Sequence, residues 1–315
     1  MHLLIPFACT HAAAARAALT ELRLPQLERL LAGLTRVQTD TEDEASLSPP
    51  HERALARSLG LTVQDGRMAW AAWAARNSGL SNGAKGAWAW VTLCHWQNRS
   101  ARISMGEPLA LGVTAAESKS LLQAMRPYFA EDGITLSEHV PGTWLAQGEA
   151  FRDLACASLD RVVGRRIDAW MPQSAQAGLL LRLQNEMQML LYTHALNDER
   201  AERGQLPINS FWISGAGALP TDFAPPADAA DIVLPLTLRD AAVREDWTAW
   251  AQAWQALDAG AVTLALQRLQ QGQAVALTLC GERSAQRFEA RPVGLMRRIA
   301  QLLGREPAQV ILSDL

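Results

Sequence analysis

The hydrophobic positions between residues 179 and 194 recur with the spacing of an α-helix. Leu179, Leu183 and Met187 lie on one face of such a helix, and no proline or glycine interrupts the stretch. The pattern predicts an amphipathic helix, in which His194 continues the apolar stripe one turn further. A histidine on an apolar face is more often a satisfied core residue than a ligand, and both interpretations stay open.

A polar cluster, a strand and a glycine pair follow this helix. Residues 197–200 are all polar, and Gly204 and Pro207 mark the end of the helical pattern. Residues 208–214 are rich in strand formers and run directly into residues 215–217, Gly-Ala-Gly. A loop of this kind is a frequent place for backbone amides to meet a phosphate or carboxylate, although it is also common as a tight turn.

The remaining patterns alternate between strands and helices. We predict further helices at residues 12–22, 24–31, 50–59, 69–75, 114–129, 246–257 and 261–271. We predict further strands at residues 3–7, 88–96, 101–105, 134–136, 144–146, 232–236 and 274–280, with a loop at 39–50.

This order predicts an α/β fold with a mostly parallel sheet flanked by helices. The Gly- and Asn-rich stretch 77–86 marks a linker, after which the pattern becomes rich in strands. We therefore expect one α/β domain made of residues 1–85 and 150–315, and a smaller inserted α+β subdomain at residues 86–149.

Composition excludes several classes of protein. The net charge of −3 gives no electrostatic reason to expect nucleic acid or an anionic membrane as partner. The four cysteines are scattered and form no CxxC pair, so neither a zinc site nor a disulfide framework is indicated. The start of the chain lacks the pattern of a signal peptide, and no apolar run is long enough to span a membrane. A reducing cytoplasm is the expected location.

Tryptophan is unusually abundant, with eleven residues in the chain. Trp247, Trp250 and Trp254 are spaced so that three indoles share one face of a helix. Core packing or an interface explains such a stripe more readily than a ligand cage.

Five segments along the chain form a recognisable set: HLLIPFA, SLDRVVGRR, RLQNEMQMLLYTHALNDER, LPINSFWISGAG and LTLCGER. Together they resemble the RpfE-type regulatory proteins, a phosphoglycerate mutase-like family. More distantly, His194–Arg200, Gly204, Pro207, Asn209 and Gly215–Gly217 are similar to a segment of the archaeal-type cofactor-independent phosphoglycerate mutases. That resemblance implies the fold of the alkaline phosphatase superfamily.

The chain departs from those enzymes where their chemistry resides. The resemblance implies two metal ions, an Asp-Gly ligand after the first strand, and an Asp-His pair after the last. Here the first strand reads Leu4–Phe7 without an acid, and Cys280-Gly281 stand in the place of the Asp-His pair. The serines of the linker at 77–86 are the nearest nucleophile candidates, and nothing there supports the role. We therefore expect no catalytic residue, no metal ligand and no cofactor, and the first hypothesis is a relative that has lost its enzymatic activity.

The first functional hypothesis is a non-catalytic regulatory or ligand-sensing protein. Arginines and backbone amides suit a small anionic ligand, phosphorylated or carboxylate, although the arginines are equally well explained as structural pairs. The candidate ligand-binding residues are Arg161, Arg165, His194, Asn197, Arg200, Asn209, Ser214, Gly215 and Gly217.

Two alternatives come from other classes of protein. One is a metal-dependent phosphomutase or phosphohydrolase with a rebuilt site, in which a Cys280 ligand would favour zinc. The other is a tryptophan-rich module that binds a protein partner. Full burial of the Trp247, Trp250 and Trp254 face would weaken this second alternative.

Overall fold

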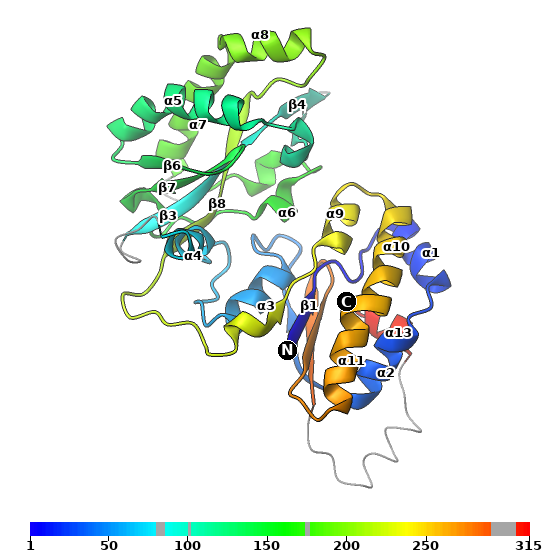
Figure 1. Ribbon diagram of the computed structural model, residues 1–315. Coiled ribbons are helices and arrows are strands. Elements are labelled where there is room, and N and C mark those ends of the chain that lie inside the picture. The colour runs from blue at the N-terminus through cyan, green and yellow to red at the C-terminus, as the bar shows by residue number, and fades with distance from the viewer. Residues whose placement is uncertain (80–85, 100–101, 174–176, 291–306) are drawn as a thin grey trace. The chain divides into compact units, whose positions relative to one another are not determined.

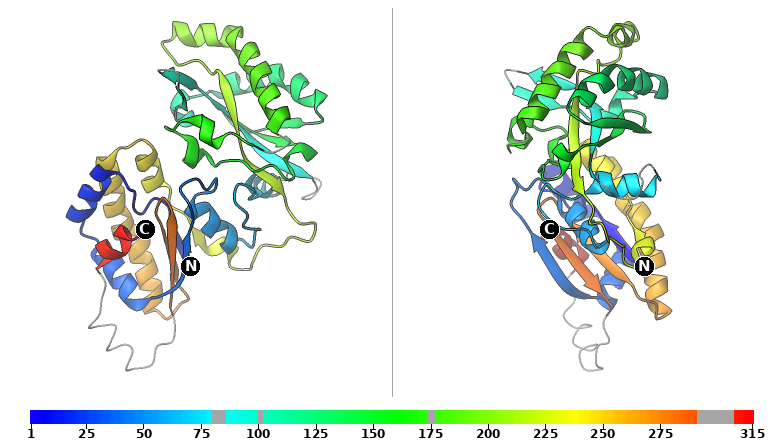
Figure 2. Two further views of the ribbon diagram at one scale, coloured as in Figure 1. Left: turned by 180° about the vertical axis from the view of Figure 1, so that it is seen from behind. Right: turned by 90° about the vertical axis from the view of Figure 1, so that its left-hand side faces the viewer.

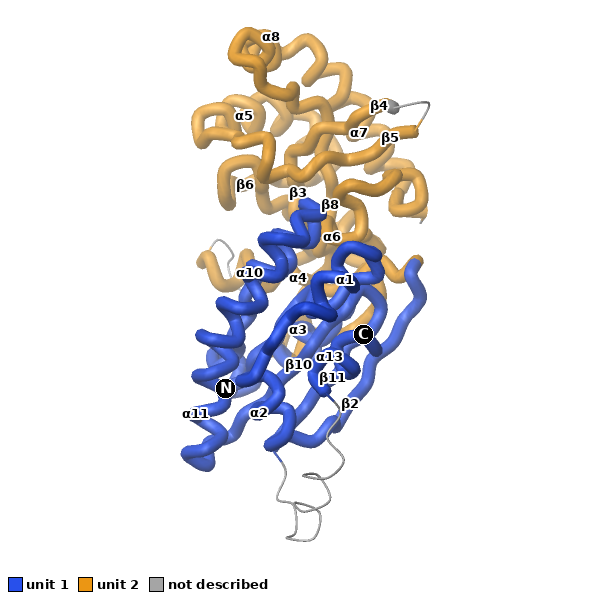
Figure 3. Tube along the Cα trace, turned by 90° about the vertical axis from the view of Figure 1, so that its right-hand side faces the viewer, with its two compact units in different colours: residues 1–44, 49–59, 225–315 blue, residues 45–48, 60–224 orange. Residues whose placement is uncertain are grey.

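The computed structural model describes the chain except residues 80–85, 100–101, 174–176 and 291–306. The chain divides into two compact units (Figure 3). Unit 1 contains residues 1–44, 49–59 and 225–315, and unit 2 contains residues 45–48 and 60–224. None of the described helices combines the length and the apolar character needed to cross a membrane.

Unit 1 is a five-stranded mixed sheet with helices on both faces (Figures 1 and 2). Its strands and helices are β1 (His2–Ile5), α1 (Ala13–Glu21), α2 (Pro25–Gly33), β2 (Thr35–Thr41), α3 (Pro50–Ser58), η4 (Ala229–Asp231), β9 (Ile232–Val233), α9 (Thr237–Val243), α10 (Trp247–Leu257), the π-helical η5 (Asp258–Val262), α11 (Thr263–Gln270), β10 (Ala276–Cys280), β11 (Ser284–Glu289) and α13 (Ala308–Ser313).

The sheet of unit 1 has the order β2-β11-β10-β1-β9. Strand β1 lies between β10 and β9, and all four of its residues are buried. Alternate side chains face opposite sides, so Leu3 and Ile5 pack with α1, α2, α10 and α11, while Leu4 packs with α3. Helix α2 begins at Pro25, which suits the first turn of a helix.

Unit 2 is built on a four-stranded antiparallel sheet of order β6-β7-β3-β8. Its strands and helices are α4 (Trp70–Asn77), β3 (Ala87–Cys94), β4 (Trp96–Arg99), β5 (Arg102–Met105), η1 (Pro108–Leu111), α5 (Ala115–Glu131), β6 (Thr135–Val140), β7 (Thr143–Gln147), η2 (Glu149–Phe151), α6 (Leu159–Val162), η3 (Ile167–Trp170), α7 (Ala177–Tyr192), α8 (Ala195–Glu202) and β8 (Ser210–Ala218). Helices α5 and α7 cover one face of the sheet, and α4 packs on the other (Figure 1).

The expected α/β class is confirmed, but the prediction of a mostly parallel sheet is wrong. In unit 1 only the pairs of β1 with β10 and with β9 are parallel, whereas β10–β11 and β11–β2 are antiparallel. All described strand pairs of unit 2 are antiparallel. The reason is the short turn between β10 and β11, since only antiparallel neighbours can be joined without a crossover.

The two units differ in their boundaries from the predicted domains. Residues 150–224 lie in unit 2, together with the stretch 86–149 that was expected to stand alone. The physical cause is β8, which pairs with β3 from Cys94↔Ser210 to Ala87↔Ala218. This long-range pairing draws the second half of unit 2 onto the sheet formed by the first half.

Several local predictions also need correction. Residues 39–41 belong to strand β2 and not to a loop, and His95 divides the predicted strand 88–96 into β3 and β4. Most of the linker at 77–86 lies outside the described residues, including Ser81, one of the nucleophile candidates.

Candidate functional site

The carboxyl ends of parallel strands β1 and β10 meet at one edge of the unit 1 sheet, where α/β folds commonly bind ligands. The amide of Ala8 donates a hydrogen bond to the carbonyl of Cys280 at 2.7 Å. Phe7 adopts a left-handed conformation with φ 52°, so the backbone turns sharply after β1.

The tryptophan helix secures this turn. Trp250 Nε1 donates to the carbonyl of Phe7 at 2.9 Å, and Trp254 Nε1 donates to the carbonyl of Ala8 at 3.2 Å. Both indoles are fully buried and meet edge to face, whereas Trp247 is partly buried. Two of the three indoles are therefore core, which weakens the hypothesis of an interaction surface for Trp250 and Trp254 but not for Trp247.

The end of β10 is also filled by the protein itself. Cys280 is fully buried, and burial raises the pKa of its thiol far above neutrality. A Cβ on Gly281 would come within 2.5 Å of the carbonyl oxygen of Leu315. A neutral thiol and a glycine do not fit a two-metal site. Within the described parts of the chain, no three His, Cys, Asp or Glu side chains form a group that could hold a metal ion.

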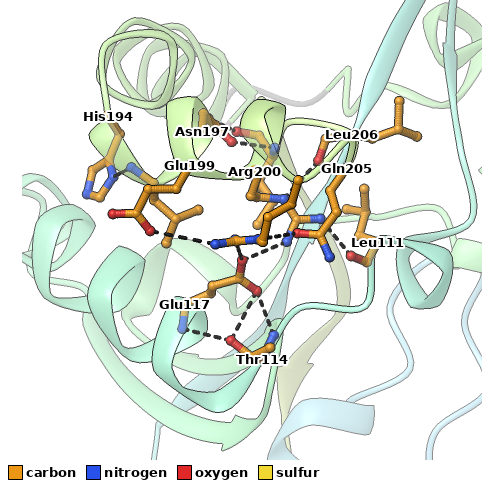
Figure 4. A network of polar contacts seen from close by, with 12 residues as sticks. Leu111, Thr114, Glu117, His194, Asn197, Glu199, Arg200, Gln205 and Leu206 are labelled. Atoms are coloured by element: carbon orange, nitrogen blue, oxygen red, sulfur yellow. Dashed lines mark hydrogen bonds and ion pairs between the residues drawn. The ribbon is translucent and has the colours of Figure 1, made fainter.

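His194 caps a helix and does not continue an apolar stripe. Helix α7 ends at Tyr192 and α8 begins at Ala195, a helix that the sequence pattern did not predict. His194 Nδ1 accepts a hydrogen bond from the amide of Leu196 at 3.2 Å, as N-cap side chains do (Figure 4). The expected position of His194 on the core face of one long helix is wrong because the chain turns at this cap.

Both the nitrogen and the oxygen of the Asn197 side-chain amide bond backbone groups of the protein. Its Nδ2 donates to the carbonyls of Leu191 and Ile208, and its Oδ1 accepts from the amide of Ile208, each at 2.8 Å. These three bonds tie the end of α7 to the segment that enters β8.

Arg200 is completely buried at the centre of a polar network (Figure 4). Its guanidinium donates to the carbonyls of Leu206 at 2.8 Å and Leu111 at 2.6 Å, and Nη1 lies 3.0 Å from Glu117 Oε1. Arg203 reaches the same carboxylate oxygen at 2.9 Å. The network connects α5, α8 and η1, so Arg200 acts as a structural bracket.

Glu117 is charged at neutral pH within this network. Burial favours its neutral form, but the hydrogen bonds from Thr114 and Arg200 outweigh burial and hold the pKa of the carboxyl below its usual value. Thr114 and Glu117 form a capping box at the start of α5, which begins next to the predicted start of this helix at residue 114.

The Gly-Ala-Gly stretch is part of strand β8 and not a loop. A bulge opposite Trp88 and Trp90 interrupts the pairing with β3 here. A Cβ on Gly215 would lie 2.8 Å from the Trp90 ring, and one on Gly217 would lie 3.0 Å from the Cβ of Ala69. The glycines thus allow α4 and Trp90 to approach β8 closely, and the prediction of a glycine loop is wrong.

The other candidate residues lie in separate elements. Arg161 in α6 is buried and lies 3.5 Å from the carbonyl of Ser48, whereas Arg165 is exposed. Ser214 is buried in β8. The structure gathers His194, Asn197 and Arg200 around α8, while Arg161, Arg165 and Ser214–Gly217 lie elsewhere.

A groove of about 570 Å³ opens on unit 2 between α7 and the β4–β5 hairpin. Asn197 and Asn209 line it, and they are the two predicted site residues that do so. Met189 and Tyr192 line it from α7 with 71% and 84% of their surfaces exposed. The sequence carried a signal that was missed, because these two side chains lie off the predicted core stripe of the helix.

No protein-family model and no curated protein matches this chain. Among solved structures, it is similar to the PH0037 protein of Pyrococcus horikoshii, with a TM-score of 0.48 and 12% identity over 92% of this chain and 87% of that one. It is also similar to a cofactor-independent phosphoglycerate mutase from Thermoplasma acidophilum, with a TM-score of 0.37 and 14% identity over 100% and 98% of the two chains. At these values the likenesses assign no residue a role.

Proposed function

We propose that this chain is a non-catalytic regulatory protein that binds a ligand or partner. The observation that carries the proposal is that the protein's own groups occupy the carboxyl ends of β1 and β10. The sequence resemblance implies metal ligands at these two strand ends, but here Trp250 and Trp254 bond the backbone after β1. Cys280, at the second strand end, is a buried neutral thiol.

The groove of unit 2 supports a binding role. Its lining combines apolar and aromatic side chains with the amides of Asn98 and Gln188. Asn197 and Asn209 also line it, with their amides bonded to protein backbone groups. Pockets of this composition suit recognition, in which apolar area gives affinity and a few polar groups give orientation. The resemblance to RpfE-type regulatory proteins agrees with this role.

The proposal includes a small anionic ligand bound by one of the predicted arginines. Arg161 and Arg200 are buried against protein groups, whereas Arg165 is exposed. We expect any stabilisation by phosphorylated three-carbon acids in a thermal shift assay to be lost in Arg165→Ala. The same shift in wild type and variant would remove Arg165 from the binding site.

Phosphoester turnover tests the non-catalytic proposal. Untagged protein, supplied with Mn²⁺ or Zn²⁺, is incubated with phosphoglycerates and a general phosphatase substrate. We expect no turnover above that of the metal alone. A substantial rate that disappears in Cys280→Ala, with the fold of the variant verified by circular dichroism, would establish a rebuilt metal enzyme and overturn the proposal.

A further inference from the structure

Within the described parts of the chain, strand β4 pairs only with β5, and its other edge has no neighbouring strand. The chain of β3 continues past His95 into β4, and β8 runs beside β3 only as far as the Cys94↔Ser210 pair. Beside Trp96, the side chain of Asn209 takes the place of a strand. The amide of Trp96 donates to Asn209 Oδ1 at 2.7 Å, and Asn209 Nδ2 donates to the carbonyl of Trp96 at 2.9 Å.

The next outward-facing residue of this edge is Asn98. In an antiparallel pair, the main-chain groups of alternate residues point to the same side. Because those of Trp96 point to Asn209, those of Asn98 also point away from β5, with which β4 pairs through Asn98↔Ile103. Among the described residues, none bonds the N–H or C=O of Asn98, and Asn98 lines the groove. An unpaired strand edge of this kind is a template for another extended chain.

The opposite wall of the groove offers matching side-chain contacts. Met189 and Tyr192 of α7 present exposed apolar and aromatic surface there. Asp198, in the first turn of α8, lines the same groove and is exposed. Its carboxylate forms no ion pair with any described residue, so it favours a cationic group on the occupant.

We propose that the edge of β4 binds an extended, cationic peptide segment of a protein partner by strand addition. Main-chain bonds to Asn98 extend the ladder that the side chain of Asn209 begins at Trp96. An apolar side chain of the peptide packs on Met189 and Tyr192, and a lysine or arginine pairs with Asp198. The inference rests on the proposed binding function and names the class of partner.

The chain contains only two tyrosines, Tyr128 and Tyr192, which permits a direct test. The probes are short peptides selected from a random displayed library on the full chain and then synthesised. Their binding is followed by fluorine NMR of protein labelled with fluorotyrosine, with the two resonances assigned by Tyr192→Phe. We expect bound peptides to shift the Tyr192 resonance and to leave that of Tyr128 on α5 unchanged.

Two further changes separate strand addition from simple apolar binding. Asn98→Pro removes the edge N–H at a position where an edge strand tolerates proline, and we expect a loss of affinity of about tenfold or more. N-methylation of alternate peptide amides tests the same bonds without altering the protein, and we expect a similar loss. Asp198→Asn should weaken the binding of basic peptides selectively. Tyr128→Ala is the control variant, and we expect it to leave peptide affinity unchanged.

Three results would overturn the inference. Selection could yield no peptide that shifts Tyr192, binding could survive both Asn98→Pro and N-methylation, or Tyr192 could respond only to protein concentration. The last result would make the groove a contact between two copies of the chain. The proposed function fails separately, through metal-dependent phosphoester turnover, whatever the peptides do.

Discussion

Arg200 and Glu117 form an ion pair across 83 positions of the chain, with Nη1 and Oε1 3.0 Å apart. The arginine side chain is 0% exposed and the glutamate side chain 10% exposed. Replacing Arg200 with methionine leaves the carbonyls of Leu111 and Leu206 without this donor and removes the buried charge partner of Glu117. We expect unit 2 to lose about 3 kcal/mol of unfolding free energy, measured by urea denaturation.

Arg203→Ala is the matched control, because Arg203 contacts the same oxygen of Glu117 with its side chain 47% exposed. Exposed pairs contribute at most about 1 kcal/mol. Equal losses in the two variants would contradict the bracket role of Arg200.

Gly215 should tolerate alanine less well than Gly164, which has a similar backbone conformation but no close neighbour. Gly215 has φ 61° and would place a Cβ 2.8 Å from Trp90, whereas Gly164 has φ 74° with nothing within 4 Å. Both substitutions carry backbone strain, but only Gly215→Ala also forces α4 or Trp90 to move. We expect it to cost about 1–3 kcal/mol more than Gly164→Ala, and similar unfolding free energies for the two variants would refute the close-packing explanation.

His2 should make the stability of unit 1 depend on pH in a defined window. Burial, and secondarily the charge of Arg287, lower the pKa of His2 from 6.5 to about 4. The unfolded chain therefore takes up the proton first, so protonation favours unfolding. The contribution of His2, about 3 kcal/mol, is complete above pH 6.5 and is lost as the pH falls towards 4.

Chemical denaturation of wild type and His2→Gln across this window measures the effect. As the pH falls, we expect the denaturation midpoint to decline much less in His2→Gln than in the wild type. His139→Gln, at an exposed position on β6, is the control, and a decline that persists unchanged in His2→Gln would exclude His2 as its source.

Trp250 should matter more to stability than Trp247, although both lie on α10. Trp250→Phe removes the donor to the carbonyl of Phe7 and leaves a buried acceptor unpaired, which costs about 1–3 kcal/mol. Trp247→Phe changes a partly exposed indole, and we expect a clearly smaller loss in the thermal unfolding of unit 1. A larger loss at Trp247 would contradict the stabilising role of the bond from Trp250 to the carbonyl of Phe7.

Local patterns predicted the elements whose signals are short in range. The capping box of Thr114 and Glu117, the proline at the start of α2 and the tryptophan spacing of α10 all lie within a few residues of the structure they specify. Each such signal acts through a single helical turn or face, so the sequence alone carries it.

Local patterns do not predict pairing between segments that are far apart in the sequence. Nothing near Ser210 indicates that β8 pairs with β3, more than a hundred positions earlier, and this pairing changes the division of the chain into units. The sequence predicts a ligand-binding loop at Gly215 because it does not show that Trp70 and Trp90 pack closely against this glycine. Asn197 and Arg200 bond backbone carbonyls of the protein, and the sequence does not separate this use from ligand binding because both employ the same side chains.

The metal content of the untagged protein tests the central claim most directly. It is measured by mass spectrometry after growth with manganese and zinc, and again after the purified protein is reloaded with each metal. The non-catalytic account predicts no stoichiometric metal in either case. About two metal ions per chain, the number that a two-metal phosphotransfer site requires, would contradict it and restore the enzyme hypothesis.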